Sequence, residues 1–107
     1  MAVNVLTDEN FTDELNNSEK VIVKYMAGWC GSCRLLGPKF KRLSNDELYS
    51  AIQFVEVDAE MNAEARKFAG VTNLPFIAII HKGKILEAKP TSKEESIVEM
   101  LSKLSEL

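Results

Sequence analysis

Apolar and polar residues recur along the chain with two different periods, and these periods predict where strands and helices lie. Residues 21–26 are mostly β-branched or aromatic, and they are apolar on both faces except at Lys24, which is typical of a central buried strand. In residues 33–43 the leucines and Phe40 recur every three or four positions, as on the buried face of a helix. The same pattern predicts strands at 3–6, 53–58, 76–80 and 84–88, and helices around Phe11 and Leu15, at 59–68 and after residue 92.

Residue types between these elements predict how the helices begin and how the strands are joined. Thr7 or Asp8 is expected to cap the first helix, and residues 92–95 have the sequence of a capping box for the last one. The two residues 82–83 predict a tight turn that closes a hairpin of the last two strands. The resulting order, β-α-β-α-β-α-β-β-α, predicts an α/β fold with a mixed central sheet and helices on both faces.

Length and composition narrow the class of protein. With 107 residues the chain can build one hydrophobic core, so residues 1–107 are expected to form a single domain. A net charge of −3 argues against a partner that is a nucleic acid or an anionic membrane, because binding either one needs a basic face. No apolar run approaches the ~20 residues that span a bilayer, and residues 1–7 lack the pattern of a signal peptide. We therefore expect a cytoplasmic protein without a membrane partner.

The candidate chemistry lies in one short segment, because the two cysteines of the chain are Cys30 and Cys33. A bridge between residues three apart stabilises no distant contact, so the pair is interpreted as reactive or metal-binding rather than as a structural disulfide. A structural zinc site needs four ligands, and beyond the pair the sequence offers His81 and no carboxylate at a recognisable spacing. A further alternative is that the two cysteines are simply small buried hydrophobic residues without a chemical role.

The pair follows a buried strand and begins a helix, and this position favours a nucleophile. Unpaired N–H groups and the positive end of the dipole at a helix N-terminus favour the thiolate form of a cysteine. Cys30 is therefore the candidate attacking thiolate, and Cys33, one turn further along, can resolve a mixed disulfide with Cys30. The site would lie beyond the carboxyl ends of the strands, where open α/β sheets place their sites.

Several other stretches stand in a specific order and spacing relative to the cysteine pair. They are the run Trp29-Cys30-Gly31-Ser32-Cys33, Pro38, the strand at 55–58, the segment Val71-Thr72-Asn73-Leu74-Pro75 and the turn Lys82-Gly83-Lys84. Together they resemble the thioredoxin family over nearly the whole chain. The resemblance implies the thioredoxin fold, with Cys30 as the attacking cysteine, Cys33 as the resolving one and Pro75 as a cis-proline that faces the pair. It also implies a set of substrate-contacting residues, namely Trp29, Gly31, Ser32, Leu74 and Pro75, with Leu74 acting through its backbone.

The sequence departs from the usual thioredoxin pattern at residues that tune the cysteine pair. Ser32 stands where proline is usual, and its backbone N–H and hydroxyl would stabilise the reduced form. We therefore expect a reduction potential above the roughly −270 mV of ordinary thioredoxin. Lys24 stands where a buried aspartate is usual, and Phe54 where its companion lysine is usual. We expect Lys24 to pair with Glu56, because an unpaired buried ammonium is too costly, and the alternative is that Lys24 extends to the surface.

These observations predict a protein dithiol–disulfide oxidoreductase that acts in electron transport and cell redox homeostasis. Reduced Cys30 would attack a disulfide of a substrate protein, and Cys33 would release the reduced substrate, leaving a Cys30–Cys33 disulfide as the redox-active centre.

The expected partners are disulfide-containing substrate proteins and a recycling thioredoxin reductase. The chain is expected to be a monomer that holds no metal. It is also expected to bind no nicotinamide or flavin cofactor, since it lacks a Gly-rich dinucleotide fingerprint. Two alternatives stay open: a binding module with incidental thiols, and an iron–sulfur carrier in which two chains share a cluster through Cys30. Oxidase and isomerase roles also stay open within the enzyme class.

Overall fold

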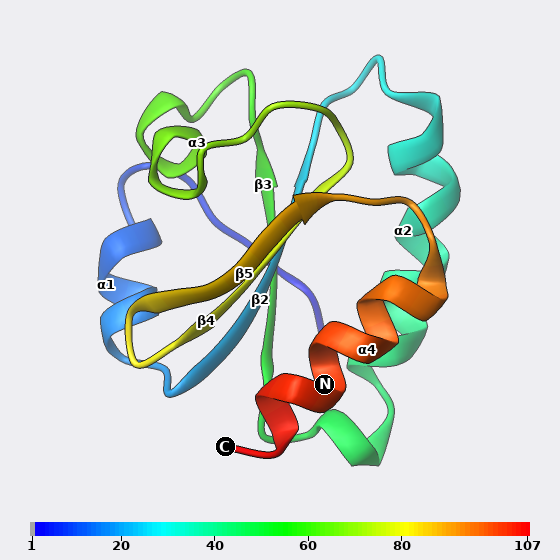
Figure 1. Ribbon diagram of the computed structural model, residues 1–107. Coiled ribbons are helices and arrows are strands. Elements are labelled where there is room, and N and C mark those ends of the chain that lie inside the picture. The colour runs from blue at the N-terminus through cyan, green and yellow to red at the C-terminus, as the bar shows by residue number, and fades with distance from the viewer. Residues whose placement is uncertain (1) are drawn as a thin grey trace.

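A computed structural model, which describes residues 2–107, has a central β-sheet with helices on both faces (Figure 1). The elements occur in the predicted order, with one additional short 3-10 helix. In residues 2–107 the strands are β1 (Asn4–Val5), β2 (Lys20–Met26), β3 (Gln53–Asp58), β4 (Phe76–His81) and β5 (Lys84–Pro90). The helices are α1 (Phe11–Asn16), α2 (Gly31–Ser44), the 3-10 helix η1 (Glu47–Tyr49), α3 (Ala63–Ala69) and α4 (Glu94–Ser105). Within this part of the chain, no helix is both long enough and apolar enough to cross a membrane.

The strands form one mixed sheet in the order β1-β3-β2-β4-β5. The central strand β2 is parallel to β3 and antiparallel to β4, so Lys24 is in register with Glu56 on one side and with Ile77 on the other. β5 pairs antiparallel with β4 across a turn in which Lys82 and Gly83 both have positive φ angles, the requirement of a tight two-residue hairpin. The predicted mixed sheet with its closing hairpin is confirmed.

Alternation along the strands produces two hydrophobic cores, one on each face of the sheet. On one face, Val21, Val23 and Tyr25 of β2 belong to the core under α1 and α3, which lie on the left of Figure 1. On the other face, Ile22 packs into the core under α2 and α4, on the right. Because successive residues of a strand point to opposite faces, Lys24 shares the face of Ile22 and lies under α2.

The structure corrects the predicted cap of the first helix. Neither Thr7 nor Asp8 caps α1, whose N-cap residue is Asn10 and has no side-chain cap hydrogen bond. The Asp8 carboxylate instead accepts the backbone N–H groups of Glu64 and Ala65 at 3.2 and 2.9 Å. Asp8 therefore caps α3, a helix more than 50 residues further along the chain, and local sequence contains no information about such a contact.

The other helix starts also differ from the prediction. The capping box is wrong, because α4 begins at Glu94 with Lys93 as an N-cap residue that makes no side-chain bond. α2 begins at Gly31, two residues earlier than expected. α3 begins at Ala63, four residues later than expected, because the Asp58 carboxylate accepts the N–H groups of the two residues 60–61 and holds them in a turn.

Candidate active site

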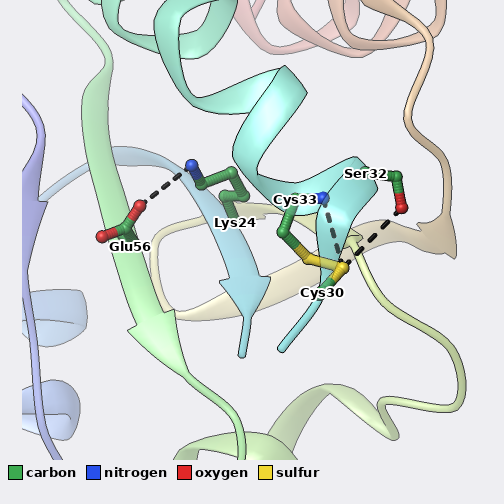
Figure 2. Close-up of a disulfide and its surroundings, with 5 residues drawn as sticks. All are labelled: Lys24, Cys30, Ser32, Cys33 and Glu56. Carbon is green, nitrogen blue, oxygen red and sulfur yellow. Dashed lines mark hydrogen bonds and ion pairs between the residues drawn. A yellow bond between two sulfur atoms is a disulfide. The ribbon is translucent and has the colours of Figure 1, made fainter. Parts of the chain in front are cut away.

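The cysteine pair lies where β2 and β3 end and α2 begins (Figures 1 and 2). The N–H of Ala59 donates to the carbonyl of Met26 at 2.8 Å, which ties the ends of the two strands together. The N–H of Cys30 donates to the carbonyl of Ala27 at 3.1 Å, and this turn delivers Cys30 to the N-cap position of α2. The site is thus positioned at the carboxyl edge of the sheet, as open α/β folds favour.

Cys30 and Cys33 are joined by a disulfide, and both residues are buried. The N–H of Cys33 donates to the Cys30 Sγ at 3.2 Å, and the Ser32 hydroxyl lies 3.7 Å from the same sulfur (Figure 2). α2 continues for 14 residues, so the positive end of a long helix dipole lies at Cys30. When the disulfide is reduced, all three groups would favour a thiolate over a thiol on Cys30.

Leu74, which precedes Pro75, approaches the disulfide from a distant part of the chain. The Leu74 side chain packs against the small cluster formed by Ala27 and the two cysteines. The Leu74–Pro75 peptide bond is cis, as the resemblance to thioredoxins implies, and Pro75 is buried. The Pro75 carbonyl accepts the N–H of Thr91 at 3.1 Å, which fixes this segment against the start of the loop before α4.

Trp29, Gly31 and Ser32 are exposed beside the buried disulfide. The Trp29 side chain is 65% exposed, which is unusual for a residue whose burial would contribute strongly to a core. An exposed large aromatic ring next to a reactive group offers contact area to a partner. Trp29, Gly31 and Ser32 thus lie at the surface next to the buried cysteine pair, and Leu74 packs against that pair from a distant segment.

Lys24 and Glu56 form an ion pair under α2, as the sequence predicts. Lys24 Nζ lies 2.9 Å from Glu56 Oε1, and the two side chains are 4% and 28% exposed (Figure 2). The same nitrogen lies 5.3 Å from the centroid of the Phe40 ring, within the range of a cation–π contact. The alternative in which Lys24 extends to the surface is wrong, because its side chain is buried.

A cavity of about 350 Å³ connects this ion pair with the cysteine pair. Cys33, Lys24 and Glu56 all line it. Gly37 lines the same cavity, and the Cβ of an alanine there would lie 3.8 Å from Lys24 Nζ. The residue pattern did not identify Gly37 or Phe40 as neighbours of Lys24. Helical spacing from Cys33 could have found them, since residues three or four apart share a helix face.

Neither the nearby Tyr25 phenol nor a metal site adds to the chemistry of the cysteine pair in residues 2–107. Tyr25 lies next to Lys24 in sequence but on the opposite face of the sheet, where its hydroxyl donates to the carbonyl of Ala65 at 2.8 Å. Burial raises the pKa of the Tyr25 phenol, so it stays protonated and does not exchange protons with the cysteine site. Within residues 2–107, no three His, Cys, Asp or Glu side chains converge to hold a metal ion.

Comparison with known proteins agrees with this geometry. Residues 2–103 match the family model named Thioredoxin. The chain belongs to the thioredoxin family. Thioredoxin-1 of Schizosaccharomyces pombe is 32% identical over 101 residues, which cover 91% of this chain and 96% of that protein. The solved structure of Malassezia sympodialis thioredoxin is 19% identical, covers 97% of this chain and 91% of its own, and has a TM-score of 0.90. The predicted thioredoxin fold is confirmed.

The chain is also similar to part of a much longer protein. Protein disulfide-isomerase A4 of Rattus norvegicus is 29% identical to this thioredoxin-family chain over 98 residues. That match covers 90% of this chain, whereas the chain spans 15% of the length of the isomerase. Family membership and the Cys30–Cys33 disulfide support a dithiol–disulfide oxidoreductase, and they do not favour the binding module or the iron–sulfur carrier.

Proposed function

We propose that this chain reduces disulfides of substrate proteins through Cys30 and Cys33. The observation that carries the proposal is the disulfide at the start of α2, with the Cys33 N–H 3.2 Å from the Cys30 Sγ. In the first step, the Cys30 thiolate attacks a substrate disulfide, forms a mixed disulfide and releases one substrate thiolate. In the second step, Cys33 loses its proton and attacks the Cys30 Sγ, which releases the second substrate thiolate. The substrate gains two electrons, and the chain is left with its Cys30–Cys33 disulfide.

Trp29, Gly31, Ser32, Leu74 and Pro75 are the proposed substrate-contacting residues. The exposure of Trp29 supports a role in docking, and the packing of Leu74 against the cysteines supports a position beside the scissile disulfide. An extended substrate segment next to Leu74 would find backbone groups with which to pair, as an added strand does at a sheet edge. This arrangement would bring a substrate sulfur close to Cys30.

Ser32 is proposed to raise the reduction potential of the pair. Its hydroxyl lies 3.7 Å from the Cys30 Sγ, close enough to donate to a thiolate after a small rotation. Stabilising the reduced form makes the pair a weaker reductant, so the expected potential lies above the roughly −270 mV of ordinary thioredoxin. Equilibration with glutathione measures it, and Ser32→Pro should lower it. A potential at or below that value in the unsubstituted chain would contradict the role.

Lys24 and Glu56 are proposed to tune the second step, in which Cys33 must lose a proton. Support comes from the cavity that the three residues share and from the partial exposure of Glu56, which connects it with solvent. Glu56→Gln removes the proton acceptor and should change the pH profile of disulfide reduction. An unchanged pH profile would leave the ion pair with a structural role alone.

The proposal extends to partners and location. A thioredoxin f2 that is 22% identical to this chain, with a TM-score of 0.87, has been solved in complex with ferredoxin:thioredoxin reductase. By analogy, a reductase of this kind would return two electrons to the Cys30–Cys33 disulfide of our chain. Residues 1–107 would act as a single monomeric domain in the cytoplasm, where protein thiols are kept reduced.

A single-turnover experiment with trapping variants tests the function and both cysteine roles. The reduced chain is mixed with a protein that contains disulfides, such as insulin, and new substrate thiols are counted. We expect one substrate disulfide to be reduced per chain, no reduction by Cys30→Ser, and a stable mixed disulfide through Cys30 in Cys33→Ser. Reduction by Cys30→Ser at the original rate would refute the assignment of the nucleophile.

A further inference from the structure

A groove runs away from the cysteine pair along one side of α2. It consists of two adjoining cavities of about 350 and 360 Å³, which share Lys24, Gly37 and Glu56. The first cavity ends at Cys33, and the second ends at β1. We call this feature the α2 groove and define it by residues from both cavities, namely Val5, Cys33, Arg34, Gly37, Lys41 and the Lys24–Glu56 pair.

The wall that α2 contributes to this groove is positively charged. α2 carries four cationic side chains and no carboxylate, although the chain as a whole has a net charge of −3. Arg34 and Lys41, about two helical turns apart, line the groove and are exposed. No carboxylate of residues 2–107 forms an ion pair with either of them, whereas Arg42 is paired with Glu94 of α4. The one carboxylate in the groove, Glu56, is already paired with Lys24.

The opposite wall of the groove is apolar and belongs to the edge of the sheet. β1 is the outermost strand, paired with β3 alone, and its Val5 side chain is 66% exposed. Val3 continues this apolar wall, and Phe40 of α2 adds a further apolar residue to the groove lining. A ligand with phosphates on every unit, such as a nucleic acid, would place charges against this wall. A polypeptide that alternates acidic and aliphatic side chains would match both walls.

We propose that the α2 groove binds an acidic, extended segment of a substrate protein that lies beside the disulfide to be reduced. The proposal rests on the proposed function, because the groove begins at Cys33 and a segment bound in it continues toward Cys30. Carboxylates of the segment would meet Arg34 and Lys41, and its aliphatic side chains would cover Val5. The groove would thus select substrates by the charge of the sequence that flanks their disulfide.

A rate comparison with two peptides tests this selection. Both peptides contain the same intramolecular disulfide, and the flanking segment is Glu-Leu-Glu-Val-Glu in one and Gln-Leu-Gln-Val-Gln in the other. The measured quantity is the ratio of their reduction rates within each protein, so general changes in reactivity cancel. We expect the acidic peptide to react about threefold to tenfold faster at low ionic strength, and the ratio to fall toward one at ~0.5 M salt.

Two variants assign the selection to the groove. The double variant Arg34→Gln, Lys41→Gln should bring the ratio close to one, while Lys39→Gln, which removes a charge from the same helix outside the groove, should keep most of it. A ratio near one in the unsubstituted chain would overturn the proposal. So would a ratio that survives in the double variant, or one that Lys39→Gln reduces equally.

A binding measurement separates this proposal from the proposed function. The acidic segment without cysteines is titrated into the oxidised chain, and amide chemical shifts are followed by NMR. We expect the largest changes at residues 3–5 and 34–41 and much smaller ones with the Gln segment. If neither disulfide peptide is reduced, the proposed function fails. The NMR titration still shows whether the groove binds the acidic segment. Shifts confined to other parts of the chain, or absent at millimolar peptide, would overturn it.

Discussion

Glu56→Gln is expected to destabilise the fold more than Lys24→Met, although both substitutions break the same ion pair. The reason is the unequal burial of the two partners, with side-chain exposures of 4% for Lys24 and 28% for Glu56. Glu56→Gln leaves an ammonium in the protein interior, whereas Lys24→Met leaves a carboxylate that can hydrate from the groove. Removing one member of a fully buried pair costs about 3–5 kcal/mol, because the other charge remains uncompensated.

The geometry reduces that cost in each variant by a different amount. In Glu56→Gln, the amide oxygen can still accept from Lys24 Nζ, and Phe40 still faces the ammonium at 5.3 Å, so we expect about 2–3 kcal/mol. In Lys24→Met, an apolar chain of similar length packs against Phe40, and the hydrated carboxylate is penalised little. We expect about 1 kcal/mol or less for that change.

Guanidinium unfolding of the oxidised proteins at pH 7, followed by circular dichroism, measures both free energies of unfolding. The double variant completes the cycle and isolates the coupling between the two side chains. Glu87→Gln is a suitable control, because Glu87 also pairs with a lysine, Lys103, whose side chain is 61% exposed. It should cost under about 1 kcal/mol. A Lys24→Met variant that loses as much stability as Glu56→Gln, or a coupling energy near zero, would refute the reasoning.

Three further predictions concern residues outside the active site. Asp8→Ala removes the cap of α3 and should cost about 0.5–2 kcal/mol in chemical denaturation, and an unchanged midpoint would contradict the capping role. Gly70→Ala should cost about 1 kcal/mol because Gly70 has a φ of 65° at the end of α3, whereas Gly28→Ala, with open space around its Cβ, should be close to neutral in the same assay. Hydrogen bonds from Lys103 and Lys89 lower the pKa of Glu87 below its ordinary 4.5. The stability that Glu87 contributes should therefore be present at neutral pH and be lost as the pH falls through the lowered pKa. The melting temperatures of the unsubstituted chain and of Glu87→Gln should differ at pH 7 and converge in acid.

The sequence predicted more of the strands than of the helix ends, and the difference has a physical cause. A strand such as β2 is recognisable because its apolar, β-branched residues fit a buried sheet wherever the neighbouring strands lie. A helix cap needs only one side-chain oxygen near the first N–H groups, and that oxygen can come from any part of the chain. Asp8 is the example: it has the right side chain for a cap, but it serves α3 instead of α1.

Some residues of the candidate site could be predicted from the sequence, and the groove beside it could not. Spacing alone placed Cys30 and Cys33 one helical turn apart, and the cost of an unpaired buried ammonium predicted that Lys24 pairs with Glu56. The strand register explains the geometry of this pair, since parallel pairing of β2 and β3 sets Lys24 directly beside Glu56. The groove along α2 could not be predicted, because its apolar wall comes from β1 and depends on where that strand docks.

The local features of this protein follow from its sequence alone: a buried central strand, a CxxC pair at the start of a helix, and a tight turn between the last two strands. These depend on residues close together in the chain, whose spacing is set by the geometry of strands and helices. The packing of distant segments set the strand order, the approach of Leu74 to the disulfide, and the closure of a charged groove between α2 and β1. Those contacts join residues far apart in the chain, so they depend on the packing of the whole fold rather than on any local preference.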